Sequence, residues 1–426
     1  MNTMTLTEHQ NVVANKVLFE IYQALCGKRN PFVSLSGPAG VGKTVCTQMI
    51  INVLKDKYNI TATAPTHKAT KVLSKNLFGV TSSTIHSFLS LKLKPDFNTG
   101  LQILIEDWSQ EKSKGSNSVD ILVVDEASQI SFEMFNHIKK GVEKGKAKVV
   151  LFVGDSMQLK PVDNQNESIY SFIKSQFLTE IVRQAQDNPI IRVATEIRLM
   201  IESKNFKKLD ELFTESFDTV QVYTDGKQFL NDYCNDQKDK IICTYTNEVV
   251  DTYNTYARAM IKGADCPYLT EGDELIFQET LASNNGKKID YMNNDVVCVK
   301  SAEKAYDSKL KLWYWFVVPY DNSPFKVVDS DSLSIWKEYL SGLANSAKNG
   351  GKDTKRLWAF YFNEISRFAN VKYTYASSLH KLQGSTYENV YFDFRSLYKY
   401  TYDIDTIYRL IYVALTRASC SVKVLK

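Results

Sequence analysis

The 426-residue sequence predicts an α/β fold with parallel sheets, and three observations support that prediction. A short apolar run at residues 32–35 ends in a glycine-rich loop and is followed by a helical pattern over residues 43–54. Further short apolar runs alternate with helical stretches, which favours crossover connections within a parallel sheet. A second pattern of the same kind begins near residue 241, and the chain is long enough for two or three domains.

The first α/β pattern opens with a helix over about residues 10–25, where apolar side chains recur at helical spacing until Pro31 breaks the chain. The pattern lapses between residues 89 and 119, where lysines and aromatics precede a tail rich in Lys, Ser, Gly and Asn. We interpret that segment as an inserted hairpin or small subdomain. Strands of this unit are expected at residues 32–35, 60–64, 121–124 and 149–153.

The second α/β pattern is interrupted by a segment of a different character. Short alternating strands separated by turn residues indicate a small β-barrel, and two helices follow it at about residues 333–347 and 354–368. The α/β elements on either side are expected at residues 241–244, 248–261, 390–394 and 406–415. The strands of the barrel are expected at residues 273–277, 296–299, 311–318 and 325–328.

Composition limits the class of protein but does not decide it. Hydrophobic residues make up 44% and charged residues 23%, as in globular rather than disordered chains. The polar first ten residues and the absence of an apolar run of about 20 residues predict a cytoplasmic protein with no membrane partner. Seven scattered cysteines are expected to be reduced thiols. A net charge of +4 permits a nucleic-acid partner without requiring one.

A complete phosphate-binding loop follows the first predicted strand and opens a helix, which is the context that such a loop requires. Its glycines let backbone N–H groups converge on phosphate oxygens at the helix N-terminus. Lys43 supplies positive charge to the β- and γ-phosphates of ATP, and the Thr44 hydroxyl is a ligand for Mg²⁺. The expected nucleotide-binding residues of this loop are Gly37, Pro38, Ala39, Gly40, Val41, Gly42, Lys43 and Thr44.

Polar residues also end two further predicted strands. Asp125 and Glu126 close one of them, where Asp125 would hold Mg²⁺ and Glu126 would orient or deprotonate the attacking water. Gln158 follows another and carries an amide that could contact the γ-phosphate. These residues predict an ATPase, and the second half of the chain decides between the many kinds of P-loop ATPase.

Two runs in the second half, residues 378–386 and 411–418, follow the first-half motifs along the chain, and the second of them is expected on a helix of the second α/β pattern. Together with the first-half motifs they resemble those of superfamily 1B DNA helicases, the group that includes RecD and TraI helicases, and most closely the Dda-like members. The likeness runs from Leu6 to Arg417, although the inserted regions match only in placement and length.

The resemblance implies an α/β architecture of two RecA-like parallel-sheet motor domains. An inserted hairpin is expected in the first domain, and an inserted small β-barrel plus helical hairpin in the second. The implied boundaries are 1–88 and 119–182 for the first domain, 89–118 for the pin hairpin, 183–267 and 371–426 for the second domain, and 268–370 for its insertion.

The resemblance also assigns residues to the nucleotide. Gln10 would recognise the adenine. Gln383 and Gly384 would belong to the loop that connects the DNA contacts to the nucleotide. Arg183 and Arg417 would reach the γ-phosphate and stabilise the charge that develops there. Ser385 and Thr386 stand where several superfamily members carry an acid for the ribose, so the resemblance does not settle how the ribose is read.

For DNA, the resemblance implies contacts mainly to phosphates, with bases stacking on aromatic side chains. For His67, His86 and His380, which are among the expected contacts, a helix-capping or packing role is the alternative. In the inserted hairpin, Phe97 and Trp108 are candidates for a strand-separating pin, and packing inside the hairpin is the alternative. The expected DNA contacts are Pro65, Thr66, His67, Thr84, His86, Thr246, Asn247, Ser378, His380 and Lys381.

The expected function is that of an ATP-dependent helicase, with ATP and Mg²⁺ as cofactors, that moves 5′ to 3′ on single-stranded DNA and unwinds duplex DNA in replication or recombination. Expected partners are single-stranded DNA and fork junctions, with a single-strand-binding protein or other replication proteins as further candidates, and we expect a monomer. One alternative is an ATP-driven factor that displaces or loads proteins on DNA without strand separation. A P-loop phosphotransferase is the other, but it has no use for the second α/β domain.

Overall fold

The computed structural model describes residues 6–106, 118–161, 168–181, 188–216, 219–282, 289–400 and 403–426. The chain divides into two compact units. The first comprises Met1–Leu91, Glu106–Val250 and Ser377–Lys426, and the second comprises Lys92–Ile105 and Asp251–Ala376.

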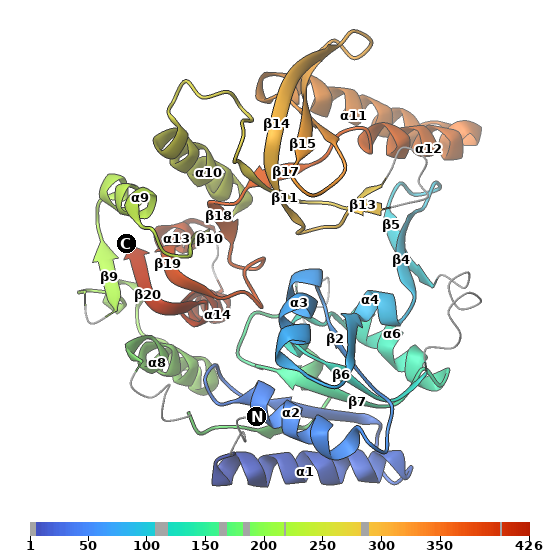
Figure 1. Ribbon diagram of the computed structural model, residues 1–426, viewed down its shortest axis with the longest axis vertical. Helices are drawn as coiled ribbons and strands as arrows, with labels where there is room; N and C mark the ends of the chain where they lie inside the picture. The colour runs from blue at the N-terminus through green and yellow to red at the C-terminus, as the bar shows by residue number, and fades with distance from the viewer. Residues whose placement is uncertain are drawn as a thin grey trace. The chain divides into compact units, whose positions relative to one another are not determined.

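The first unit contains a six-stranded sheet in the order β3-β2-β6-β7-β1-β8, and every strand pair in it is parallel. Figure 1 labels three of its strands, β2, β6 and β7. Apolar side chains of α1, including Val13 and Ile21, pack with Leu35 and Leu151 of the sheet in one core, as the helical spacing of α1 predicts. The strands are β1 (Phe32–Ser36), β2 (Ile60–Ala64), β3 (Thr81–Thr84), β6 (Val119–Val124), β7 (Ala147–Gly154) and β8 (Ser175–Phe177). The helices are α1 (Glu8–Leu25), α2 (Lys43–Leu54), α3 (His67–Asn76), α4 (Ile85–Phe88) and α6 (Phe132–Glu143).

A second sheet in the same unit has the order β18-β10-β19-β20-β9, and β10, β19, β20 and β9 pair in parallel. Two parallel α/β sheets confirm the predicted fold class. Helix α14 is buried along nearly its whole length, so it is a core helix rather than an amphipathic surface helix. The strands are β9 (Val220–Tyr223), β10 (Lys240–Thr244), β18 (Ala376–Ser378), β19 (Tyr387–Asp393) and β20 (Ala418–Leu425). The helices are α8 (Pro189–Ser203), α9 (Gly226–Asn235), α10 (Asn247–Lys262), α13 (Arg395–Tyr400) and α14 (Ile404–Thr416).

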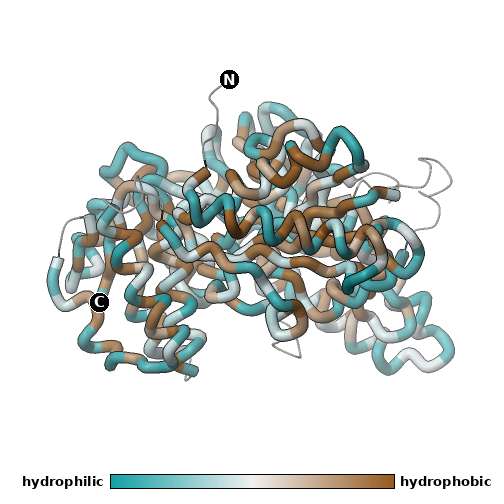
Figure 2. The backbone as a smooth tube through the Cα atoms, turned by 90° about the horizontal axis from the view of Figure 1, so that it is seen from below, coloured by the Kyte–Doolittle hydropathy of each residue, from teal (hydrophilic) through white to brown (hydrophobic). Residues whose placement is uncertain are grey.

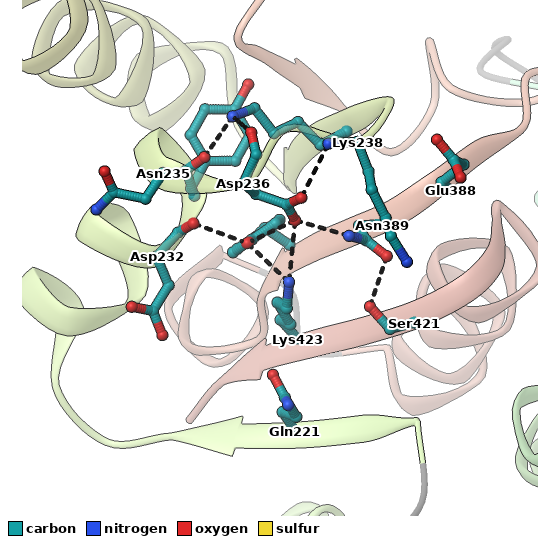
Figure 3. Close-up of polar contacts among 12 residues, drawn as sticks. Gln221, Asp232, Asn235, Asp236, Lys238, Glu388, Asn389, Ser421 and Lys423 are labelled. Carbon is teal, nitrogen blue, oxygen red and sulfur yellow. Dashed lines mark hydrogen bonds and ion pairs between the residues drawn. The ribbon is translucent and has the colours of Figure 1, made fainter.

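A polar cluster around Asp236 joins the end of α9 to the second sheet (Figure 3). The Asp236 carboxylate accepts hydrogen bonds from Asn389 Nδ2 at 2.7 Å, from the Tyr391 hydroxyl at 2.9 Å and from Lys423 Nζ at 3.0 Å. Burial alone would raise the pKa of Asp236, but these donors and the Lys238 backbone N–H hold it well below its usual range. The charged form of Asp236 is therefore part of the folded structure.

The second unit is built on a five-stranded antiparallel sheet in the order β16-β15-β14-β11-β17. Its closure into a barrel stays a prediction. The strands of this sheet are β11 (Glu274–Phe277), β14 (Val296–Asp307), β15 (Leu312–Pro319), β16 (Phe325–Val328) and β17 (Val371–Tyr373). Two further strand pairs are β4 (Leu91–Pro95) with β5 (Gln102–Glu106) and β12 (Leu281–Ala282) with β13 (Ile289–Tyr291). The helices that follow the sheet are α11 (Leu333–Lys348) and α12 (Thr354–Ile365).

The β4–β5 hairpin packs against α12. The ring of Phe97, in the turn of the hairpin, lies 6.1 Å from the ring of Phe362. Gly100 in the same turn has a φ of +73°, and a Cβ atom there would lie 2.2 Å from the Trp358 ring, so only glycine fits this contact. The turn of the hairpin is thus braced by the helical part of the second unit.

Hydrophobic and hydrophilic stretches alternate along the backbone, and many peripheral turns are hydrophilic (Figure 2). Among the residues that the structure describes, no helix has both the length and the apolar character that a membrane span requires. Short 3₁₀ helices complete the secondary structure: η1 (Ala127–Gln129), η2 (Ile169–Ser171), η3 (Leu209–Glu211), η4 (Ser330–Ser332) and η5 (Gly351–Asp353).

Candidate functional site

The loop between β1 and α2 has the backbone that the glycine pattern predicts. Gly42 caps α2 with a φ of +79° and offers no side chain to the helix end, so the first N–H groups of α2 remain open to an anion. A Cβ atom on Gly37 would lie 2.6 Å from the Leu178 carbonyl oxygen, so this position also requires glycine. The local geometry is that of a phosphate cradle.

Lys43 points back over the loop that precedes it. Its Nζ donates to the carbonyl oxygens of Gly37 at 2.7 Å and Pro38 at 2.8 Å. Burial lowers the pKa of Lys43, and the nearby carboxylates of Asp155, Glu126 and Asp125 oppose that shift. A partly buried ammonium near three carboxylates is a site whose charge pattern suits a metal–phosphate complex.

Asp125 and Glu126 directly follow β6, and their charges act on Lys43 of the phosphate loop. Glu126 adopts the left-handed conformation with a φ of +50°, a strained arrangement for a residue with a side chain. Burial, together with the adjacent Glu126 carboxylate, raises the pKa of Asp125 to about 7. A divalent cation would relieve this crowding of negative charge.

The residues present fit Mg²⁺ rather than a fully protein-bound metal. Among the described residues, no group of three or more His, Cys, Asp or Glu side chains could hold a metal ion. Mg²⁺ is typically held by one or two protein oxygens together with substrate phosphates and water. The Thr44 hydroxyl and the Asp125 carboxylate would be those oxygens, and the bound ion would neutralise charge on the phosphates.

The first unit contains two α/β domains, one built on each parallel sheet, and α8 and α14 belong to the second of them. Side chains of these two helices hold the turn that follows β7. The fully buried Asp155 carboxylate accepts from the Tyr412 hydroxyl at 2.6 Å and from Arg198 Nη1 at 3.4 Å. Arg409 Nη1 donates to the carbonyl oxygens of Ser156 at 2.9 Å and Gln158 at 2.8 Å. The sequence reasoning did not single out Asp155, Arg198, Arg409 or Tyr412. The sequence feature that could have indicated such contacts is Arg409 within the apolar pattern of α14, because a buried arginine is rare unless it is paired.

Gln158 lies at the end of this turn and is 7% exposed. Its Oε1 accepts a hydrogen bond from the Ser128 hydroxyl at 3.4 Å. Ser128 lies two residues after Glu126 in the chain. The structure thereby brings Lys43, Asp125 and Gln158 of the predicted catalytic set to the carboxyl ends of neighbouring strands. This is the edge at which α/β sheets bind ligands.

Residues 383–385 of the second domain reach the first domain. Gln383 Nε2 donates to the Leu159 carbonyl oxygen at 3.5 Å, and a Cβ atom on Gly384 would lie 3.6 Å from Glu126 Oε1. Buried Arg417 donates from Nη1 to the Ser385 carbonyl oxygen at 3.0 Å. Its Nε has no hydrogen-bond partner in the part of the chain that the structure describes, and neither has the Ser385 hydroxyl. The hydrogen-bonding capacity of these two buried polar atoms is therefore not used within the described part of the protein.

The side-chain amide of Gln10 makes hydrogen bonds within the protein through both its oxygen and its nitrogen. Its Oε1 accepts from the Thr7 backbone N–H at 2.9 Å, and its Nε2 donates to the Val41 carbonyl oxygen at 2.9 Å. Gln10 therefore ties the start of α1 to the phosphate loop. Its expected contact with adenine stays a prediction, and the expected role of Arg183 falls outside the described residues.

The expected DNA contacts gather at strand ends of both sheets. Thr66 and Thr84 cap short helices directly after the neighbouring strands β2 and β3, and Pro65, His67 and His86 flank them. Thr246, Asn247, Ser378, His380 and Lys381 follow or end the neighbouring strands β10 and β18. Burial lowers the pKa values of His86 and His380, which favours neutral imidazoles at physiological pH. Their contacts with DNA stay predictions, and of the two pin candidates only Phe97 lies among the described residues.

The fold and this site define a P-loop ATPase with two RecA-like domains. A family model described as an AAA domain matches residues 19–212, and one described as a UvrD-like helicase C-terminal domain matches residues 373–425. The ATP-dependent DNA helicase dda of Enterobacteria phage T4 is 28% identical over 454 residues, covering 97% of both chains. The RecBCD enzyme subunit RecD of Buchnera aphidicola subsp. Schizaphis graminum is 24% identical, over 85% of this chain and 65% of RecD.

The crystal structure of Pif1 helicase from Candida albicans has the same overall fold, with a TM-score of 0.50. It is 17% identical, and the match covers 100% of this chain and 95% of that one. Over nearly its whole length the chain is similar to superfamily 1B helicases of the Dda type, and its two ends match the two family models.

Proposed function

We propose that this chain is an ATP-dependent DNA helicase that moves 5′ to 3′ along single-stranded DNA and separates duplex strands. The contact between Gly384 of the second domain and Glu126 of the first carries the proposal. It puts a second-domain loop against the acid that would direct the attacking water. A hydrolytic site in contact with both α/β domains can turn nucleotide turnover into relative domain movement.

The catalytic roles follow from positioning and charge. Lys43 and Thr44 would hold the phosphates and Mg²⁺, Asp125 would complete the metal site, and Glu126 would orient the water. Arg417 supplies positive charge to the γ-phosphate from the second domain, supported by its burial and its unpaired Nε among the described residues. Arg183 has the same role by its place in the sequence, and Gln158 senses the γ-phosphate.

The strand would be gripped by each domain separately. The first grip is the pair of helix starts at Thr66 and Thr84, and the second is formed after β10 and β18. Backbone N–H groups and small hydroxyl side chains at these positions suit phosphate contacts, which carry little sequence preference. Closing and opening of the nucleotide site would then move one grip past the other along the strand.

Strand separation is assigned to the β4–β5 hairpin. The packing of Phe97 against Phe362 and of Gly100 against Trp358 supports a rigid hairpin, which a wedge requires. Leu101 beside the turn is 64% exposed and offers an apolar contact surface. Phe97 is thus a brace as well as the candidate tip residue.

The test is unwinding of matched forked DNA duplexes that carry a single-stranded tail of either 5′ or 3′ polarity. The expected result is ATP-dependent unwinding from the 5′ tail, no unwinding from the 3′ tail or a blunt duplex, and none with Lys43→Ala. Unwinding only from the 3′ tail overturns the polarity. DNA-stimulated ATP hydrolysis that displaces a bound protein without separating strands favours the displacing or loading factor instead. The same duplexes made of RNA test the choice of DNA.

A further inference from the structure

The turn that follows β7 belongs to the first α/β domain by its strand but is held by side chains of the second. Asp155 begins this turn, has no exposed surface and lies near Lys43, whose charge it influences. A buried carboxylate is costly unless hydrogen-bonded donors surround it. Here the donors are the Tyr412 hydroxyl of α14, Arg198 of α8 and the Met157 backbone N–H.

Arg409, one helical turn before Tyr412 on α14, holds the far side of the same turn. Its Nη1 donates to two carbonyl oxygens, and its Nε pairs with Asp405 at 2.9 Å, which fixes the guanidinium. Arg198 is fixed in the same way by Glu202, whose Oε1 lies 2.8 Å from Arg198 Nε. Both arginines are 7% exposed, so solvent screens these contacts little.

The turn is connected directly to the groups that would handle the nucleotide. The Tyr412 hydroxyl, which donates to Asp155, also lies close enough to the Ala39 backbone N–H of the phosphate loop to interact with it electrostatically. At the other end, Gln158 contacts Ser128, two residues after Glu126. A displacement of α14 would therefore be felt at the phosphate loop, at Gln158 and near Glu126.

We propose that Tyr412, Arg409 and Arg198 form a clasp on the turn 155–158 that transmits movement of the second domain to the γ-phosphate end of the nucleotide site. The inference rests on the proposed motor function and deepens it. The three side chains are positioning residues, because they act on Asp155 and Gln158 rather than on the reacting atoms. The clasp makes the rate of hydrolysis depend on how the second domain is placed, and hence on the strand that it holds.

Tyr412→Phe tests the proposal because it removes one hydroxyl and keeps the buried ring. Tyr408→Phe is a matched control, since Tyr408 lies one turn earlier on α14, is also buried, and donates to the Lys207 carbonyl oxygen at 2.8 Å within the second domain. In Tyr412→Phe we expect the DNA-stimulated kcat to fall about tenfold and KM for ATP to change less than about twofold. We also expect more ATP to be consumed per base pair unwound. Tyr408→Phe should lose some thermal stability and keep these kinetic values.

Equal kinetic behaviour of the two phenylalanine variants overturns the clasp, and so does a change confined to KM or to the melting temperature. Arg409→Lys is the second variant, for use if Tyr412→Phe does not fold. It retains a charge for Asp405 but loses the planar guanidinium that reaches both carbonyl oxygens, so it should show the same kcat and coupling defect. A wild-type protein that unwinds DNA while both variants behave as the control refutes the clasp alone. A wild type without DNA-stimulated hydrolysis refutes the proposed function, and the clasp with it.

Discussion

The backbone of Gly384 lies against the side chain of Glu126, so that a Cβ atom at position 384 would stand 3.6 Å from Oε1 and 3.7 Å from Cγ of that glutamate. These two residues are 258 positions apart in the sequence and belong to different α/β domains. The acid proposed to direct the attacking water therefore has part of its surroundings supplied by the second domain.

Gly384→Ala is expected to slow ATP hydrolysis. The φ of +74° at this position is unfavourable for alanine by about 1 kcal/mol, and the strain can be relieved only by moving a loop that touches Glu126. We expect a loss of about tenfold or more in DNA-stimulated kcat, because small misplacements of catalytic groups are costly. Gly145→Ala is the control, with a φ of +78° and nothing within 4 Å of the added Cβ. The prediction fails if both variants keep the wild-type rate.

Lys43→Ala should abolish ATP hydrolysis and leave binding of single-stranded DNA largely intact. The ammonium is the cation of the phosphate loop, whereas the expected DNA contacts lie on other loops. Hydrolysis is measured by phosphate release, and DNA binding by the anisotropy of a labelled oligonucleotide. Loss of DNA binding in this variant would show that the two sites are not separate, and residual turnover would argue against the assigned nucleotide site.

Arg417→Ala should preserve ATP binding and reduce kcat by about 10³-fold or more, as expected for an arginine that stabilises the transition state. Arg395→Ala is a suitable control, because Arg395 is half-exposed and pairs only weakly, at 3.4 Å, with Asp393. Nucleotide affinity is measured with a fluorescent ATP analogue, and turnover in a single-turnover assay. A near-normal rate in the Arg417 variant would indicate that the second domain does not complete the site.

Asp236→Asn should destabilise the folded protein by about 2 kcal/mol at neutral pH, because it removes a charge that accepts four hydrogen bonds. The folded-state pKa of Asp236 is depressed, so its contribution is complete above the unfolded pKa of about 4 and is lost as pH falls through the folded pKa. The stability difference from wild type should thus shrink only below about pH 4. Urea unfolding at several pH values measures it, with Asp265→Asn at an exposed position as the control. A difference that does not vary with pH would contradict the assigned charge.

Much of the candidate nucleotide site could be predicted from the sequence because the chemistry proposed for it is local. The glycines, Lys43 and Thr44 lie within eight consecutive residues, and the turn at Gly42 follows from a backbone that only glycine adopts readily. Asp125 and Gln158 could be placed because parallel strands present their carboxyl ends at one edge. The predicted helix of α1 followed from hydrophobic periodicity, and the burial of the central strands followed from their short continuous apolar runs.

The sequence by itself determined a P-loop, two parallel α/β sheets and the helicase class, because these depend on spacing and on patterns within short segments. Only the tertiary structure decided that Tyr412 donates to Asp155 across 257 positions, that Arg409 holds the carbonyl oxygens beside it, and that Phe97 rests on α12. Such pairings depend on how buried helices and loops pack against one another. A local pattern records that a side chain is buried but not which distant partner satisfies it.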